Sequence, residues 1–233
     1  MRGCQNLKKT DHSNTIPFES VKVGILLAIV GGFLDAYTFV GRGGVFANAQ
    51  TGNIVLIGIE IYNRNFHKTL FAVAPVLACI LGVIFVEIIK EKCPKKLAEE
   101  SETVIIIVEI IIFFFIGFIP KSVNDSIVNI IVAFVSSVQI ASFRRLVDSP
   151  YSTTMCTGNL RTATQSAYIA ITKKNEKAFE KSIRYFKIVG GFLIGGFLGA
   201  MMTSYFGVSS IWFASIVLII TVIVVKIDKR KHA

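Results

Sequence analysis

Two copies of a Thr-Gly-Asn motif, 106 residues apart, are the part of this sequence that most strongly suggests a binding function. They are Thr51-Gly52-Asn53 and Thr157-Gly158-Asn159. Glycine lets the backbone turn without a clash at Cβ, and Thr and Asn side chains can cap the start of a helix. The N-terminus of such a helix presents a partial positive charge to a solute. We therefore predict a solute-binding site at the two motifs. The alternative is a pair of capped, buried helix breaks that bind nothing.

Asp35 and Asn48 precede the first motif and add to this predicted site. Asp35 lies in an apolar segment, where a carboxylate costs about 2.5–3.5 kcal/mol or more unless it is neutralised or paired. One interpretation is a proton- or cation-coupling site. The other is a carboxylate near the outer interface that is hydrogen-bonded to Asn48 or paired with Arg42.

Gln139 and Arg161 complete the candidate residues. Gln139 shares a helix face with Ser136, three positions before it, and could face a polar pathway. Arg161 follows the second motif by two positions and could attract an anion or pair with an acidic residue, Glu109 or Asp35; a simple interfacial Arg is the alternative. The predicted solute site thus comprises Asp35, Asn48, Thr51, Gly52, Asn53, Gln139, Thr157, Gly158, Asn159 and Arg161.

Long apolar blocks must position these residues. Hydrophobic residues make up 53% of the 233-residue chain and charged residues only 17%, which excludes a soluble enzyme or a disordered chain. A helix needs about 20 apolar residues to cross a bilayer. We predict an all-α membrane protein with one membrane domain, residues 23–226, between tails at 1–22 and 227–233. Its six predicted transmembrane helices cover residues 23–40, 70–89, 103–119, 126–143, 188–206 and 208–225.

The motif-bearing segments, residues 45–62 and 154–171, are too polar to cross the membrane while facing lipid. If neither crosses and the N-terminus is inside, 21 of the 25 Lys and Arg residues lie on the cytoplasmic side. This bias predicts a multi-pass protein of the bacterial inner (cytoplasmic) membrane with both termini cytoplasmic. It also accounts for the net charge of +10 without a nucleic-acid partner.

The motifs divide the chain into two similar halves, repeat 1 at about 23–119 and repeat 2 at about 126–226. Each half has three predicted spans, and because three is odd the second half must be inverted relative to the first. We therefore predict a 3+3 inverted repeat in which two re-entrant or broken Thr-Gly-Asn segments dip in from opposite sides. Small residues recur every fourth position in the span after each motif, and these ladders permit helix contact and a homo-oligomer. They are Ala74, Ala78 and Gly82, then Gly191, Gly195 and Gly199.

The same motifs carry a resemblance to a known family. The stretch Gly32-Phe33-Leu34-Asp35-Ala36-Tyr37-Thr38-Phe39, then Gly43 to Asn48 and Thr51-Gly52-Asn53, resembles the YoaK-like family of bacterial membrane proteins, also named domain of unknown function 1275. Arg144-Arg145-Leu146 and Thr157-Gly158-Asn159-Leu160 fit the same family. Ile140 departs from it, since a polar residue aligned with Asp35 is expected there. The resemblance implies a six-span inner-membrane protein of unknown biochemical function.

From these patterns we expect a small-solute transporter or channel, with a small molecule or an ion as its substrate. The alternative is a non-transporting membrane protein for assembly or regulation. We expect no enzymatic activity, no metal site and no cofactor. The three His residues are scattered, the four Cys residues include no C-x-x-C pair, and no nucleophile has a base at a recognisable spacing.

Overall fold

Helices make up almost all of this chain. The computed structural model describes residues 18, 20–92, 95–147 and 149–232, so the predicted N-terminal tail, residues 1–22, lies almost entirely outside the described residues. The helices are α1 (Val21–Gly41), α2 (Gln50–Tyr62), α3 (Phe66–Lys92), α4 (Lys95–Ile116), α5 (Asp125–Ser142), α6 (Cys156–Lys173), α7 (Glu176–Phe206) and α8 (Ile211–His232). A 3-10 turn, η3 (Gly207–Ser210), joins α7 to α8. The all-α fold is confirmed, apart from a hairpin of two-residue strands, β1 (Arg145–Leu146) and β2 (Ser149–Pro150).

Polar side chains mark the starts of two of the long helices. The Ser20 hydroxyl accepts a hydrogen bond from the Val23 N–H (3.4 Å) and caps α1. The side-chain oxygen of Asn175, Oδ1, accepts one from the Ala178 N–H (3.1 Å) and caps α7. Each cap satisfies one of the N–H groups that the first turn of a helix leaves without an intrahelical partner.

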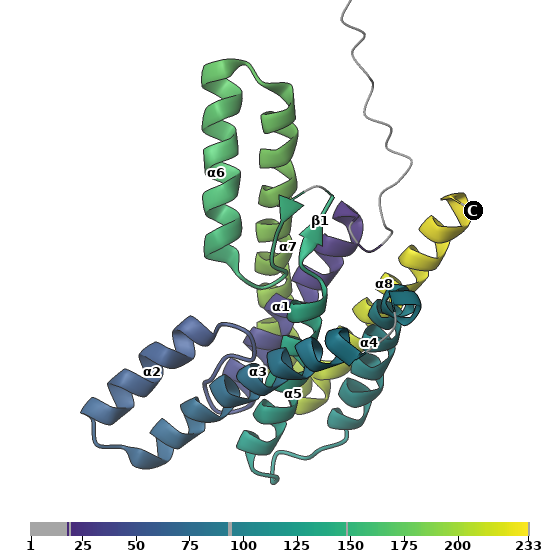
Figure 1. Ribbon diagram of the computed structural model, residues 1–233. Helices are drawn as coiled ribbons and strands as arrows, with labels where there is room; N and C mark the ends of the chain where they lie inside the picture. The colour runs from purple at the N-terminus through teal and green to yellow at the C-terminus, as the bar shows by residue number, and fades with distance from the viewer. Residues whose placement is uncertain (1–17, 19, 93–94, 148, 233) are drawn as a thin grey trace, which may run out of the picture.

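The helices pack as pairs around α1. The most extensive contact is between α1 and α7, followed by α3 with α5, α6 with α7, α2 with α3, and α4 with α8. Apolar side chains of α1, α4, α5 and α8 form the largest buried cluster, with Leu27, Ile106, Phe113, Val132 and Leu218 among them. In Figure 1, the start of α1 and the end of α8 lie at the same end of the molecule, and α2 and α6 run from its centre toward opposite ends.

Four stretches of the described chain are long and apolar enough to cross a membrane. They are Val21–Gly41, Phe66–Lys92, Asp125–Ser142 and Glu176–Arg230, the last of which covers both α7 and α8. Helix α4 carries too many acidic residues to qualify, Glu102 and Glu109 among them. Large apolar side chains cover the outside of these helices, as expected for lipid-facing surfaces. The structure therefore supports an all-α membrane protein.

Glycine permits the close contact between α1 and α7. A Cβ atom added at Gly195 would overlap the backbone of Ile29, and one added at Gly32 would overlap the backbone of Phe192. Helices in lipid associate through close packing, and small residues let their backbones approach. The glycine ladder predicted from the sequence is therefore a helix-helix contact within the chain.

Replacing Gly195 tests this contact, and Gly190 on the same helix supplies a matched control. Gly195→Ala should lower the thermal stability of the detergent-purified protein, because overpacking a tight contact costs about 1–3 kcal/mol or more. Gly190→Ala should leave stability unchanged or slightly higher, since a Cβ there meets no atom within 4 Å. The two melting temperatures can be compared by size-exclusion chromatography of heated samples. Equal melting temperatures would contradict a backbone contact at Gly195.

Candidate functional site

The connection between α1 and α2 folds back along α1 to the middle of that helix. The Thr38 hydroxyl accepts a hydrogen bond from the Ala47 N–H (3.1 Å), and Asp35 Oδ1 accepts one from the Asn48 N–H (2.6 Å). The Asn48 side-chain amide then donates to the carbonyl oxygen of Gly31 (3.1 Å). Gly31 is the central residue of the 21-residue α1, so α2 begins beside the midpoint of α1.

The connection between α5 and α6 reaches the same midpoint from the other end of α1. A Cβ atom added at Gly24 would lie 2.8 Å from Leu146 Cδ1, and one added at Gly31 would lie 2.5 Å from Thr154 Cγ2. The chain thus passes from the first turn of α1 to its centre, and α6 begins two residues later at Cys156. Residues that are far apart in the sequence, Asn48 and Thr154, therefore both contact Gly31.

The two motif asparagines bind the backbone of these connections in the same way. Asn53 Oδ1 accepts a hydrogen bond from the Phe46 N–H (2.9 Å), and Asn53 Nδ2 donates to the Phe46 carbonyl (2.7 Å). Asn159 makes the same pair of bonds with Ser152, at 3.5 Å and 2.6 Å. Both asparagines are buried, at 0% and 3% exposure. Each one satisfies the N–H and the C=O of the residue seven positions before it, and we call this arrangement the asparagine bracket.

The helices start just before the motifs, which changes the predicted role of the motif side chains. The residues at the N-cap positions are Ala49 and Met155, and neither caps its helix with a side chain. The prediction that Thr and Asn cap the helix starts is therefore wrong in detail. The asparagines lie in the first turn and reach back to the connection, while Thr51 and Thr157 project into the space between the two helix starts.

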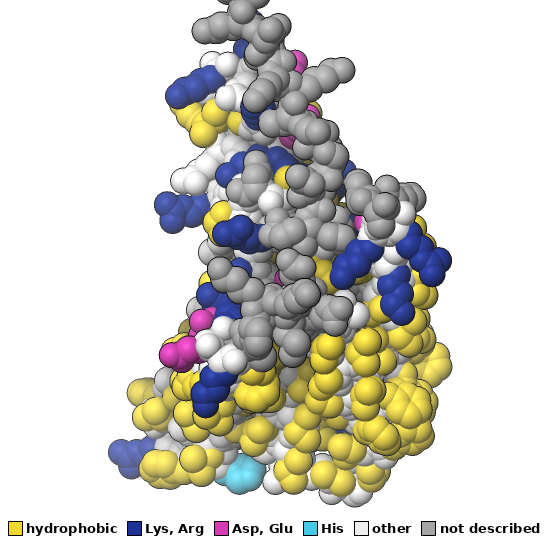
Figure 2. Space-filling view, turned by 45° about the vertical axis from the view of Figure 1, so that its right-hand side comes forward, with side chains coloured by type: hydrophobic (Ala, Val, Ile, Leu, Met, Phe, Trp, Pro, Cys, Tyr) yellow, Lys and Arg dark blue, Asp and Glu magenta, His cyan; other side chains and the backbone are white. Residues whose placement is uncertain are grey.

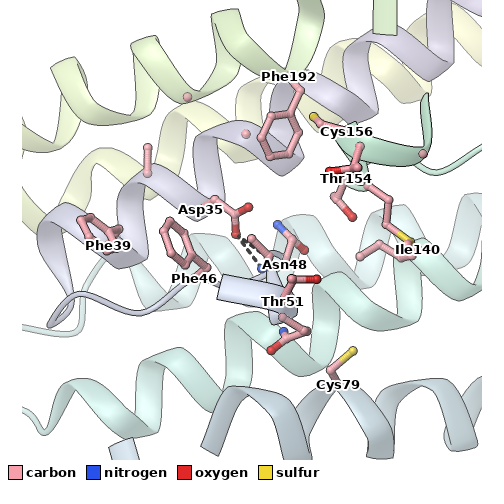
Figure 3. A pocket seen from close by; sticks show the side chains of 18 of the residues that line it. Asp35, Phe39, Phe46, Asn48, Thr51, Cys79, Ile140, Thr154, Cys156 and Phe192 are labelled. Atoms are coloured by element: carbon pink, nitrogen blue, oxygen red, sulfur yellow. Dashed lines mark hydrogen bonds between the residues drawn. The ribbon is translucent and has the colours of Figure 1, made fainter. Parts of the chain in front are cut away.

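A cavity of about 750 Å³ occupies that space. Residues of α1, α2, α6 and α7 form most of its wall, with one residue each from α3 (Cys79) and α5 (Ile140). Most of the wall is apolar, and Figure 3 shows the side chains of Asp35, Asn48, Thr154 and Phe192 around a common space. Pockets of this size with apolar walls and a few polar groups are typical sites for small molecules.

The structure brings half of the predicted site residues to this cavity. Asp35, Asn48, Thr51, Thr157 and Gly158 line it. Gly52 lies under the Phe46 ring, and the amides of Asn53 and Asn159 are used in the brackets. The remaining two predicted residues, Gln139 and Arg161, do not line the cavity.

Gln139 and Arg161 have other surroundings. Gln139 is buried in α5 at 1% exposure, and its side-chain nitrogen has no hydrogen-bond partner among the described residues. Arg161 is exposed on α6, and no ion pair joins it to Asp35 or Glu109 in the part of the chain that the structure describes. Arg42 is likewise not the partner of Asp35, because it pairs with Asp125 (3.3 Å) near the end of α1.

Several cavity residues were absent from the predicted set. Thr154 and Cys156 flank the second motif, Phe46 precedes the first motif, and Phe192 lies in the glycine-rich part of α7. Nearness to the motifs could have suggested the first three. Phe192 had no local signal, since only the packing of α7 on α1 brings it to the cavity. The wall holds no metal site: among the described residues, no three His, Cys, Asp or Glu side chains form a metal-binding group.

Two buried polar atoms on the cavity wall have no hydrogen-bond partner among the described residues. They are the Asn48 side-chain carbonyl oxygen and the Thr154 hydroxyl oxygen. Thr154 is only 7% exposed. Buried polar atoms are nearly always hydrogen-bonded, so these two oxygens are candidate contacts for a bound molecule.

Two comparisons with known proteins found relatives of this chain. A family model described as "Protein of unknown function (DUF1275)" matches residues 23–224. The UPF0700 transmembrane protein YoaK of Bacillus subtilis (strain 168) is 27% identical over 139 residues, which cover 58% of this chain and 61% of YoaK. The aligned part thus spans about three fifths of that relative. No solved structure matches the chain significantly.

The asparagine brackets predict a matched pair of stability losses. Asn53→Ala and Asn159→Ala should each lower the melting temperature, because a buried N–H and C=O lose their partner at about 1–3 kcal/mol for each group left unpaired. Asn63→Ala is the control, since Asn63 is exposed at the end of α2. Thermal unfolding of the three variants in detergent measures the effect. A loss at only one of the two motif positions would contradict the equivalence of the brackets.

Proposed function

This chain belongs to the DUF1275 family, and we propose that it is a membrane transporter or channel for a small solute, with its central site in the cavity between the starts of α2 and α6. One observation carries the proposal. The connections before α2 and α6 reach the midpoint of α1 from opposite ends of that helix, and both α2 and α6 begin beside one cavity. Non-helical backbone at membrane depth is stable only where it is buried in protein or lines water.

The length of α1 supports a central depth for this cavity. At 1.5 Å per residue its 21 residues extend over about 31 Å, close to the ~30 Å thickness of the hydrocarbon core. Its midpoint, Gly31, then lies near the middle of the bilayer. By the same rise, α2 (13 residues, about 20 Å) and α6 (18 residues, about 27 Å) are each longer than the ~15 Å from the bilayer centre to the edge of the hydrocarbon core, so both can reach the surface from there.

The pattern of helix pairs supports an inverted repeat of three plus three spans. A two-fold relation between the halves would exchange α1 with α5, α2 with α6, α3 with α7 and α4 with α8. This exchange turns the α1–α7 pair into α5–α3 and the α2–α3 pair into α6–α7, and it leaves the α4–α8 pair unchanged. All of these pairs are in contact. The asparagine brackets follow the same exchange, and α2 and α6 run toward opposite ends of the molecule (Figure 1). In this arrangement α1, α3, α4, α5, α7 and α8 are the six spans, and α4 is included in spite of its acidic residues because it pairs with α8 as its counterpart.

The distribution of basic side chains supports the orientation. Lys and Arg side chains gather in the upper part of Figure 2, while apolar side chains cover most of the lower part. Cytoplasmic loops of membrane proteins are enriched in Lys and Arg. We therefore assign the tip of the α6–α7 hairpin and both termini to the cytoplasmic side of the inner membrane.

The cavity chemistry fits transport better than a sealed structural core. Thr51, Thr157 and Gly158 lie in the first turns of α2 and α6, where a helix leaves some of its N–H groups without an intrahelical partner. Helix N-termini that face a central cavity are a common way to bind a solute at the membrane midplane. A protein for assembly or regulation alone would need no such opening, and its centre would be dry.

Accessibility of Cys156 tests the aqueous pathway. In a variant in which Cys4, Cys79 and Cys93 are replaced by Ser, only Cys156 remains, on the cavity wall. A charged, membrane-impermeant methanethiosulfonate should modify it both in spheroplasts and in inside-out vesicles, because a transport site opens to both sides. Modification from neither side would indicate a dry core, and modification from one side alone a dead-end pocket. Either result would contradict the transport proposal.

Filling the cavity provides a second arm of this experiment. Gly158 lines the cavity, and a Cβ atom added there meets no atom within 4 Å, so the side chain of Gly158→Trp should fill the cavity. In a protein whose only cysteine is Cys79, this substitution should slow the modification of Cys79. Gly58→Trp is the matched control, since Gly58 also has open space but lies outside the cavity. Equal rates in the two variants would show that the reagent reaches Cys79 by another route.

The inverted arrangement predicts that the two hairpin tips lie on opposite sides of the membrane. Single cysteines at Arg64, between α2 and α3, and at Lys174, between α6 and α7, are exposed positions for labelling. An impermeant maleimide should label the Arg64→Cys protein only in spheroplasts and the Lys174→Cys protein only in inside-out vesicles. Labelling of both tips from the same side would exclude the inverted repeat.

A further inference from the structure

The two helix starts at the cavity differ in charge, and this difference points to the class of solute. In the first half, the Asp35 carboxylate accepts the N–H groups of Asn48 (2.6 Å) and Ala49 (3.3 Å), just before α2 begins. The partial positive charge of the α2 N-terminus is therefore offset by a carboxylate of the chain itself.

In the second half, no carboxylate of the described chain contacts the start of α6. The N–H groups of Thr154 and Met155 are held by the neutral hydroxyl of Ser152, at 3.4 Å and 3.2 Å. Ile140, in the second half, lines the cavity with an apolar side chain. The start of α6 thus has no carboxylate bound directly to its N–H groups among the described residues, although Asp35 lines the same cavity.

A buried side chain without a partner lies beside this helix start. Thr154 is 93% buried, lines the cavity, and its hydroxyl has no hydrogen-bond partner among the described residues. A hydroxyl can donate to an anionic oxygen. The α6 start therefore offers a site for a carboxylate that is built from a helix N-terminus and an unsatisfied hydroxyl.

The Asp35 side of the cavity has the opposite preference. Asp35 is 5% exposed, and its carboxyl group points into the common space (Figure 3). The side-chain carbonyl oxygen of Asn48, next to it, is a buried acceptor without a donor. An ammonium group carries three N–H donors and a positive charge, so it can donate hydrogen bonds to both the Asp35 carboxylate and the Asn48 side-chain oxygen.

The rest of the cavity wall is apolar and favours a solute with an apolar side chain. The rings of Phe39, Phe46 and Phe192 and the side chain of Ile140 also line the cavity. A solute with only a carboxylate would face the charge of Asp35, and one with only an ammonium group would leave the α6 start and Thr154 unsatisfied. A solute with both charges and an apolar side chain satisfies every polar group named here.

We propose that the cavity binds a small zwitterion of the neutral amino-acid class, with its ammonium group at Asp35 and Asn48 and its carboxylate at Thr154 and the N-terminus of α6. This inference rests on the proposed function, because the cavity must open for the solute to enter. It names the class of solute that the transport site carries.

Three probes that share one apolar body test the proposal. They are L-leucine, isoamylamine, which is leucine without its carboxylate, and isocaproate, which is leucine without its amino group. Isothermal titration of the full-length protein in detergent should give leucine an affinity at least about tenfold higher than either analogue, since each analogue lacks one charge-assisted contact. If leucine binds no more tightly than one of the analogues, or does not bind, the proposal is overturned.

Two variants assign the ends of the solute. Thr154→Val should weaken leucine and isocaproate and leave isoamylamine unchanged, whereas Asp35→Asn should weaken leucine and isoamylamine more than isocaproate. Thr162→Val is the matched control on α6, because Thr162 does not line the cavity and its hydroxyl donates to the Gly158 carbonyl within the helix. Because Asp35→Asn also weakens an acceptor of two backbone N–H groups, the melting temperature of the Asp35→Asn protein must be measured. If the Asp35→Asn protein unfolds, Thr154→Val still tests the assignment. Equal effects on all three probes would overturn the assignment.

Failure of leucine binding can be distinguished from failure of the transport proposal by the Cys156 accessibility experiment. Bound leucine should also slow modification of Cys156, which lies on the same wall. If Cys156 is modified from both sides but leucine neither binds nor protects it, the transport proposal stands and the zwitterion is excluded. If Cys156 is modified from neither side, the transport proposal itself fails.

Discussion

Backbone polar groups that lie away from water must find partners inside the protein, and this requirement governs the centre of the molecule. Two connections, between α1 and α2 and between α5 and α6, return to the middle of α1 without helical hydrogen bonds of their own. Their N–H and C=O groups bind side chains instead: the asparagine brackets at Phe46 and Ser152, and Asp35 at Asn48. Without these bonds, several buried groups would be unpaired, each at a cost of about 1–3 kcal/mol.

Helix α1 is the element against which these connections are arranged. One of its ends receives the first connection through Thr38 and Asp35, and the other receives the second connection against Gly24. Its remaining surface contacts α7 so closely that glycine is required on both helices. Helix α1 also packs against α8, while Phe39 and Val40 near its end remain exposed.

The two halves share a backbone plan but not a charge pattern. Both contain the asparagine bracket, and both begin a helix at the cavity. Among the described residues that line it, only the first half supplies a carboxylate, while Ile140 of the second half contributes an apolar side chain. In each half, an asparagine amide binds the N–H and C=O groups of the residue seven positions before it. The site is asymmetric because side-chain charge differs, and an asymmetric site can orient a solute that has two unlike ends.

The sequence by itself determined the all-helical membrane class, the positions of the long helices and the importance of the two motifs. These features follow from local apolar content and from a repeated string of residues, which need no knowledge of packing. Tertiary structure alone decided that the asparagines bind their own connections while Thr154 and Phe192 line the cavity. Such roles depend on which atoms lie within hydrogen-bonding or van der Waals distance. That distance is set by how α7 packs on α1 and how far each connection returns along it, and neither is encoded in a local pattern.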